Sequence, residues 1–177
     1  IRTPDPRRPQ QINRSFAFGN LLALHMLDTR VIARDRQMEY ANYFGSDGSF
    51  DGVRFAADLA DTDRQLLGAE QLLWLQQQLS GSAATWQMLG QQVLMGRMNI
   101  PAPLVLGQIS FSAYSALVYK AQTAPATLTP QEQFILAQPA IPYNLDAWDG
   151  YAMAREMVLG MAKTLDKNLV VLAGDTH

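Results

Sequence analysis

The last strand-like segment of the chain constrains its fold more than any other feature. Residues 168–174 form an apolar, β-branched run that closes on Gly174, a pattern typical of a buried strand followed by a flexible turn. An amphipathic segment over 151–165 directly precedes this run and predicts a helix. Strand, helix and strand also alternate earlier in the chain, so the sequence predicts an α/β fold.

Asp175 and His177 follow this strand at once. A carboxylate and an imidazole two residues apart, at the carboxyl end of a strand, can bind one cation together. The alternatives are a chance Asp-x-His triplet and, for His177, the first residue of a purification tag. Two ligands do not complete a metal site, so the others must come from elsewhere in the chain or from a segment that is not present here.

Composition excludes several classes of protein. With 177 residues, 48% of them apolar and 17% charged, the chain is expected to form one ordered globular domain. Its net charge of −2 argues against a nucleic-acid surface, and the lack of cysteine excludes thiolate metal sites within the chain. No apolar stretch approaches the roughly 20 residues that span a bilayer. The start at Ile1, without a methionine or a signal peptide, suggests an internal segment.

Periodicity and turn signals give the expected elements. Residues 1–14 are expected to form an irregular arm, followed by a hairpin that turns at Gly19-Asn20. The expected strands cover 16–19, 21–27, 84–95 and 168–174. The expected helices run from Asp61 to Leu79, over 108–121, from the capping-box residue Thr129 onward, and over 151–165. Loops are expected over 42–53 and 97–107, where Gly and Pro are frequent.

A second polar pair, Asp28 and Arg30, follows the strand over 21–27. In open α/β sheets, ligands bind outside the carboxyl ends of the strands. The planar guanidinium of Arg30 can hold a phosphoryl oxygen in a way that Lys cannot. The alternative is a local structural pair between Asp28 and Arg30, and the spacing alone favours it.

The polar and aromatic segment 143–151 offers a possible pocket wall. Trp148 and Tyr151 would supply flat surfaces, and the polar contacts would be Asn144, Asp146 and Asp149. The alternative is a helix entry in which Asp149 caps the helix that follows. Gln91 and Gln92 on the strand 84–95 either reach the same site or face solvent.

Common catalytic motifs are missing. No Gly-x-Ser-x-Gly elbow, P-loop or Gly-x-Gly-x-x-Gly is found. His25 lies within the apolar run 21–27 and is expected to be structural. His177 is the only other histidine, so a Ser-His-Asp triad is not expected.

Several segments, taken together and in order, resemble the family of PhoD-like alkaline phosphatases and phosphodiesterases. The last of them, Gly174-Asp175-Thr176-His177, resembles the family's Gly-Asp-x-His ligand motif. The segments are Arg14–Gly19 through Leu27–Arg30, Leu66–Gln71 with Trp74-Leu75, Ala84–Trp86 to Gln91–Val93, Asn144–Tyr151 with Arg155, and Gly174–His177.

The resemblance implies a metal-dependent phosphoesterase of the calcineurin-like kind, with two mixed sheets sandwiched between helices. Family members use a multinuclear centre of iron and calcium, which activates a water or bridging oxide to attack phosphorus. Asp175 and His177 would then be catalytic metal ligands. Arg30, Asn144 and Trp148 would lie on the side of the phosphoester substrate. By the same resemblance, the protein is expected to be exported.

The chain departs from the family's pattern in one respect. The family's earlier ligands, on Gly-Asp, Asp-x-x-Tyr and Asp-Asp-His-Glu elements, lie upstream of the segment that matches Ile1. Residues 1–177 are therefore expected to be part of a catalytic domain that needs its remainder and is inactive alone. The competing hypothesis is a non-catalytic fragment or degenerate phosphatase that acts as a binding or interaction module.

Overall fold

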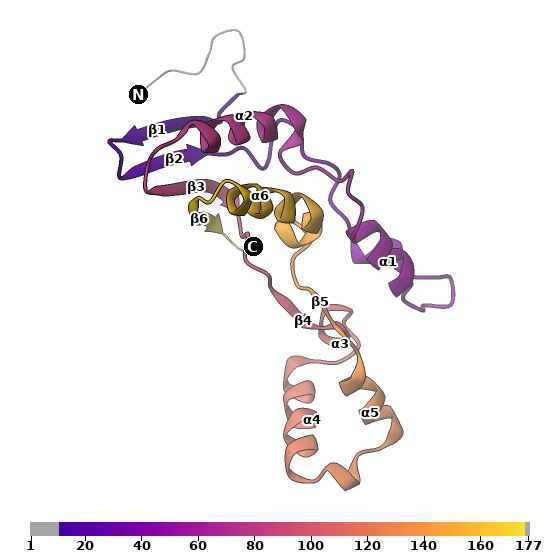
Figure 1. Cartoon of the computed structure of the whole chain (residues 1–177). Coiled ribbons are helices and arrows are strands. Elements are labelled where there is room, and N and C mark those ends of the chain that lie inside the picture. Colours follow the sequence, from indigo (N-terminus) through magenta and orange to yellow (C-terminus); the bar gives the residue numbers. More distant parts are fainter. Residues whose placement is uncertain (1–10, 176–177) are drawn as a thin grey trace. The chain divides into compact units, whose positions relative to one another are not determined.

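The structure is a computed structural model that describes residues 11–175, with the backbone only at Asp175. Its residues divide into two compact units (Figure 1). The first contains the chain up to Arg97 and from Asn144 onward, and the second is Met98–Tyr143. Each unit is described by itself below.

A four-stranded sheet forms the centre of the first unit. Its strands lie in the order β1 (Arg14–Phe18), β2 (Leu22–Met26), β3 (Trp86–Val93) and β6 (Asn168–Asp175). The hairpin expected at Gly19-Asn20 is confirmed, with β1 antiparallel to β2 and Gly19 at a φ of +59°. The strands β2, β3 and β6 are parallel. The predicted α/β class is therefore confirmed.

Two helices cover one face of this sheet, α2 (Gly68–Gly81) and α6 (Ala152–Thr164) (Figure 1). Leu75 of α2 and Val158 of α6 are fully buried, and Leu89 of β3 lies in the same core. Because side chains alternate along a strand, the residues of β3 that face the helices are Gln87, Leu89, Gln91 and Val93, all of them buried.

The opposite face of the sheet is apolar and partly exposed. Strand register places Phe18, Leu22 and Trp86 next to one another on it. Phe18, Trp86 and Leu172 are 56%, 45% and 51% exposed. Parallel sheets are normally covered on both faces, so this face is unusual for a protein exposed to water.

The start of α2 differs from the expectation. The helix begins at Gly68, and not at Asp61, because Leu66 and Leu67 are buried in the core before the chain turns. Gly68 makes this turn with a φ of +73°. A Cβ atom there would lie 2.3 Å from the Cβ of Ala33, so both conformation and space require glycine.

The glycine-rich region expected as a loop contains a small aromatic cluster. The 3₁₀ helix η1 (Tyr40–Tyr43) and helix α1 (Gly52–Leu59) bring Tyr43 against Phe55, with ring centroids 5.2 Å apart. Asp51 caps α1 by accepting the backbone N–H of Arg54. The loop is confirmed only between the two helices, since neighbouring aromatic rings stabilise a helix that local glycines disfavour.

The second unit is a small helical subdomain. It contains β4 (Asn99–Pro101), α3 (Ala102–Val105), α4 (Phe111–Thr123), η2 (Pro125–Thr127), α5 (Pro130–Ala137) and β5 (Ala140–Pro142). The predicted capping box of α5 is confirmed, with Thr129 and Glu132 each accepting the other's backbone N–H. The expected loop 97–107 is wrong in part, because β4 pairs with β5, a strand more than 35 residues away.

Within residues 11–175, none of the helices has both the length and the apolar character needed to cross a bilayer.

Candidate active site at the carboxyl end of the sheet

The parallel strands bring several distant segments to one edge of the sheet. The backbone N–H of Leu27, just after β2, donates to Gly90 of β3 at 2.9 Å. Val93, which ends β3, is in register with Asp175 of β6. The N–H of Trp148 donates to the carbonyl of Leu94 at 3.2 Å. The start of the segment after β2, the backbone of Asp175 and the segment 144–151 therefore share an edge.

Two glutamines hold the backbone where β2 ends. The side-chain oxygen of Gln71, on α2, accepts the N–H of Asp28 at 2.7 Å, and its nitrogen donates to the carbonyl of Asp28 at 2.8 Å. The oxygen of Gln92, on β3, accepts from the N–H and hydroxyl of Thr29 at 2.8 and 2.6 Å. Its nitrogen donates to the carbonyl of Leu27 at 2.9 Å. Arg30 therefore leaves the strand from a fixed position.

Gln92 was expected either to reach the site or to face solvent, and it reaches the site. Gln71 was not predicted as a site residue. The only signal in the sequence was its place in the segment Leu66–Gln71, one of those that carry the family resemblance.

Asp28 acts on the backbone of the loop that follows. Its Oδ1 accepts the N–H groups of Arg30 and Val31, each at 2.9 Å. Its Oδ2 is buried without a hydrogen-bond partner among the residues that the structure describes. The alternative of a local pair is therefore correct for the backbone of Arg30 and wrong for its guanidinium.

The guanidinium of Arg30 binds Asp146, which is 116 residues away. Its two terminal nitrogens lie 2.8 Å from Oδ1 and 2.6 Å from Oδ2 of that carboxylate. Arg34 binds the same carboxylate from another direction, with Nη2 2.5 Å from Oδ1 and 2.9 Å from the backbone carbonyl. Bidentate pairs of this kind are the more strongly held and directional ones. Sequence reasoning missed Arg34, since no motif marks it.

Asn144 fixes the local turn that presents Asp146. Its side-chain oxygen accepts the N–H of Asp146 at 2.8 Å, and its side chain is half-buried. Asn144 therefore lies at the expected edge, where it holds the backbone of the Asp146 segment.

Trp148 is a core residue, and the expectation that it forms a pocket wall is wrong. Its side chain is 0% exposed, and its indole N–H donates to Oε1 of Gln91 at 2.9 Å. With this polar atom satisfied, the ring can be buried at no hydrogen-bonding cost. Gln91 is likewise buried and does not face solvent.

The alternative of a helix cap at Asp149 is also wrong. Asp149 and Arg155 are both about 95% buried and form an ion pair with each other, whereas α6 begins without a side-chain cap. An Arg–carboxylate pair satisfies both buried charges, and an unpaired charge at this depth would be costly.

Tyr151 lies between two arginines. The guanidinium carbons of Arg34 and Arg64 are 5.0 and 4.8 Å from its ring centroid, and its hydroxyl donates to the carbonyl of Asp35 at 2.8 Å. Burial raises the pKa of Tyr151, and the neighbouring arginines oppose this effect. The ring is 1% exposed, so it packs the arginines and offers no open surface to a ligand.

The two expected metal ligands fall at the limit of the structure. The side chain of Asp175 and the whole of His177 lie outside the described residues. Among the side chains that are described, no three His, Asp or Glu residues come together in a way that could hold a metal ion.

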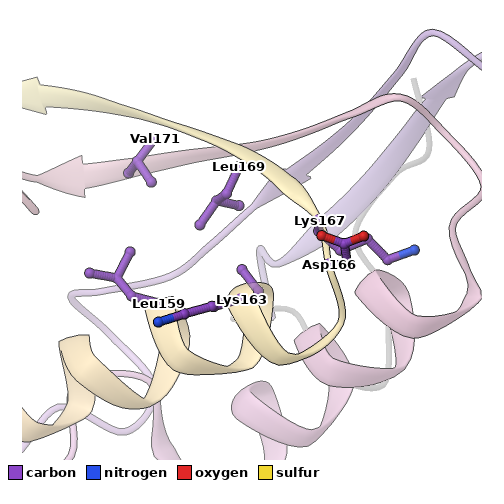
Figure 2. A pocket seen from close by; sticks show the side chains of 7 residues that line it. Leu159, Lys163, Asp166, Lys167, Leu169 and Val171 are labelled. Carbon is purple, nitrogen blue, oxygen red and sulfur yellow. The ribbon is translucent and has the colours of Figure 1, made fainter.

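A hollow of about 410 Å³ lies elsewhere on the first unit, between α6 and the beginning of β6 (Figure 2). Apolar side chains such as Leu159, Leu169 and Val171 line it, with Lys163, Asp166 and Lys167 around them. Lys167 also donates to the carbonyl of Ser82 at 2.8 Å. The hollow contains none of the expected site residues, and it adjoins the beginning of β6, whereas the candidate site adjoins its end.

A polar cluster at the carboxyl ends of parallel strands defines the class of α/β proteins that bind their ligands at this edge of the sheet. The model of the PhoD-like phosphatase family matches residues 1–177. The chain belongs to this family.

Two known proteins are similar to this chain, one in sequence and one in both sequence and structure. Alkaline phosphatase D of Bacillus subtilis (strain 168) is 30% identical over 168 residues, which cover 94% of this chain and 21% of the relative. A solved structure described as the structure of PhoD matches with a TM-score of 0.61 and 31% identity, over 100% of this chain and 26% of that one. The chain thus spans about a fifth of the length of the curated relative.

Proposed function

We propose that the full-length protein containing this chain, here called the parent protein, hydrolyses phosphate monoesters or diesters, and that this chain supplies part of its active site. Family membership supports the phosphatase class. The observation that carries the assignment to this edge is the guanidinium of Arg30. It is anchored by Asp146, and its side chain is 35% exposed at the carboxyl end of the sheet.

Arg30 is the residue proposed to contact the substrate. Asp146 contacts both terminal nitrogens of Arg30, so phosphoryl oxygens would bind the N–H groups that remain of the five in the guanidinium. Its charge offsets the charge of the transferring group. Gln71 and Gln92 would act indirectly, by holding the backbone from which Arg30 projects. Asn144 would provide a further polar contact at the same edge while it keeps Asp146 in place.

We further propose that the parent binds iron and calcium, as the resemblance to the family implies, with Asp175 and His177 as two of the ligands. A bound metal would lower the pKa of the attacking water and neutralise charge on phosphoryl oxygens. Two ligands are too few for a tight site, because calcium prefers about 6–8 oxygens. Calorimetric titration of the 177-residue chain alone should therefore show at most weak binding.

The remainder of the catalytic domain is the proposed partner of the exposed sheet face. Phe18, Trp86 and Leu172 present apolar surface that a parallel sheet normally buries. Since the chain covers 21% of its relative, that relative has ample further chain to supply a covering layer. On this proposal the isolated chain lacks the remaining metal ligands and the layer that covers this sheet face, and it should be inactive.

The reaction class can be tested with the parent protein on nitrophenyl phosphate monoesters and diesters. Turnover should be lost on treatment with a chelator and return when calcium and iron are added back. Absence of metal-dependent turnover on either substrate would instead identify a binding module or a degenerate phosphatase.

A further inference from the structure

Arg30, Arg34 and Asp146 form a compact cluster, here called the arginine clamp. The carboxylate of Asp146 contacts both guanidinium groups, with ion-pair distances of 2.6 Å to Arg30 and 2.5 Å to Arg34. The side chains of Arg34 and Asp146 are 11% and 19% exposed, against 35% for Arg30. Arg30 is therefore the member that faces outward, and Asp146 and Arg34 form its support.

The clamp carries two positive charges and one negative charge. Asp28, a second carboxylate at this edge, directs Oδ1 to the backbone N–H groups of Arg30 and Val31 and makes no bond to a guanidinium of the described residues. Among the side chains that the structure describes, Asp146 is thus the group that directly offsets the positive charge of the clamp. A charge in direct contact with Arg30 should change the affinity for an anion bound by Arg30 appreciably, since the clamp is only partly open to water.

We propose that Asp146 makes the parent protein favour phosphodiesters over phosphomonoesters by lowering the positive charge that Arg30 presents. This inference rests on the proposed function, in which Arg30 contacts the phosphoryl group. The Coulomb energy of an anion near Asp146 is proportional to the charge of that anion. A monoester dianion is therefore repelled about twice as strongly as a diester monoanion. Arg34 acts as a positioning residue that keeps the carboxylate against Arg30.

The ratio of kcat/KM for a monoester to kcat/KM for a diester isolates the effect of Asp146. Nitrophenyl phosphate and methyl nitrophenyl phosphate share a leaving group and carry about two and one negative charges near pH 8. Contributions common to both substrates, including those of the metals, cancel when the ratio for a variant is divided by that of the wild type. A purely structural role for Asp146 would lower both rates alike and leave the ratio unchanged.

The experiment measures kcat/KM of the metal-loaded parent for both substrates. Asp146→Asn should raise the monoester-to-diester ratio roughly three- to tenfold. Asp146→Glu, which keeps the charge, should leave the ratio at the wild-type value. Arg34→Gln removes a positive charge from the clamp and should shift the ratio the other way, so the inference stays testable if Asp146→Asn does not fold.

Asp166→Asn is the matched control. It removes one negative charge from the turn between α6 and β6 (Figure 2), and asparagine tolerates the φ of +50° found there. This variant should keep the wild-type ratio. An unchanged ratio in Asp146→Asn, or an equal shift in Asp166→Asn, would overturn the inference while leaving the proposed function intact. A wild-type parent that turns over neither substrate would overturn the proposed function and this inference with it.

Discussion

The side-chain amide of Gln71 binds both backbone groups of Asp28, accepting from its N–H at 2.7 Å and donating to its carbonyl at 2.8 Å. The two residues are 43 positions apart and both are buried. The contact joins α2 to the loop that carries Arg30. It therefore links the helical layer of the fold to the proposed substrate contact.

Removal of the Gln71 amide should lower the stability of the fold. Gln71→Ala leaves a buried N–H and a buried carbonyl without their partner, which should lower the free energy of unfolding by about 2–3 kcal/mol. Gln76→Ala, at an exposed position of the same helix, should change it by less than about 0.5 kcal/mol. Urea denaturation of the parent measures both. Similar losses in the two variants would mean that the Gln71 contact adds little to stability.

Replacement by alanine should have opposite effects on stability at two glycines, one just before α6 and one within it. A Cβ on Gly150 would lie 2.0 Å from the carbonyl oxygen of Leu145, so Gly150→Ala must displace the segment that carries Asp146. We expect a loss of several kcal/mol, at least about 2, as for other overpacked sites. Gly160 has open space around its Cβ position, and Gly160→Ala should stabilise the helix by about 0.5–1 kcal/mol.

Thermal unfolding of the two variants separates these effects. A neutral Gly150→Ala would show that the backbone near Leu145 relaxes freely, which would contradict the close approach seen here.

Arg30→Lys should impair turnover more than folding. Lysine keeps the charge but loses the planar guanidinium that can contact Asp146 and the phosphoryl group at once. We therefore expect kcat/KM of the parent to fall about tenfold or more. The pair with Asp146 is partly exposed, and its loss should cost no more than about 1 kcal/mol of stability. Arg97→Lys, in an exposed pair with Glu156, is the matched control and should retain full activity. Full activity of Arg30→Lys would withdraw the substrate role of Arg30.

His25 should make stability depend on pH. Nε2 of Gln87 donates to Ser82 and to the carbonyl of Ala84, each at 3.0 Å, which turns Oε1 of Gln87 toward Nε2 of His25 at 3.0 Å. The histidine is therefore protonated at Nε2, and Nδ1 accepts from the hydroxyl of Ser15 at 2.7 Å. Burial lowers the pKa of His25, and the bond to Gln87 opposes this more weakly.

The lowered pKa of His25 decides how stability changes with pH. The unfolded chain takes up a proton near pH 6.5, whereas the folded chain does so only at lower pH. Stability from His25 is thus complete above about pH 6.5 and falls with decreasing pH, by up to about 1.4 kcal/mol per pH unit, until the folded pKa is reached. Denaturation of the parent and of His25→Gln at about pH 8 and 5.5 should show a difference that shrinks on acidification. A constant difference would contradict the lowered pKa.

Local patterns in the sequence were enough to predict several elements. The hairpin at Gly19, the capping box at Thr129 and the final helix and strand all rest on residues within a few positions of one another. Their signals are turn preference, side-chain capping and periodicity, which act over short range. The place of Arg30 at a strand's carboxyl end was predicted in the same way.

The tertiary structure decided which residues meet at that end. Arg34 reaches Asp146 across 112 positions, and Trp148 reaches Gln91 across 57. The sequence could not distinguish a pocket wall from a core residue at Trp148, because burial of its indole depends on a single distant acceptor. For Asp149 it left open a pocket contact and a helix cap, whereas Arg155 makes it one half of a buried ion pair. Local sequence thus determined most of the elements. Partners brought close only by the parallel sheet determined what the polar side chains do, since nearly all buried polar groups are paired, wherever the partner lies in the chain.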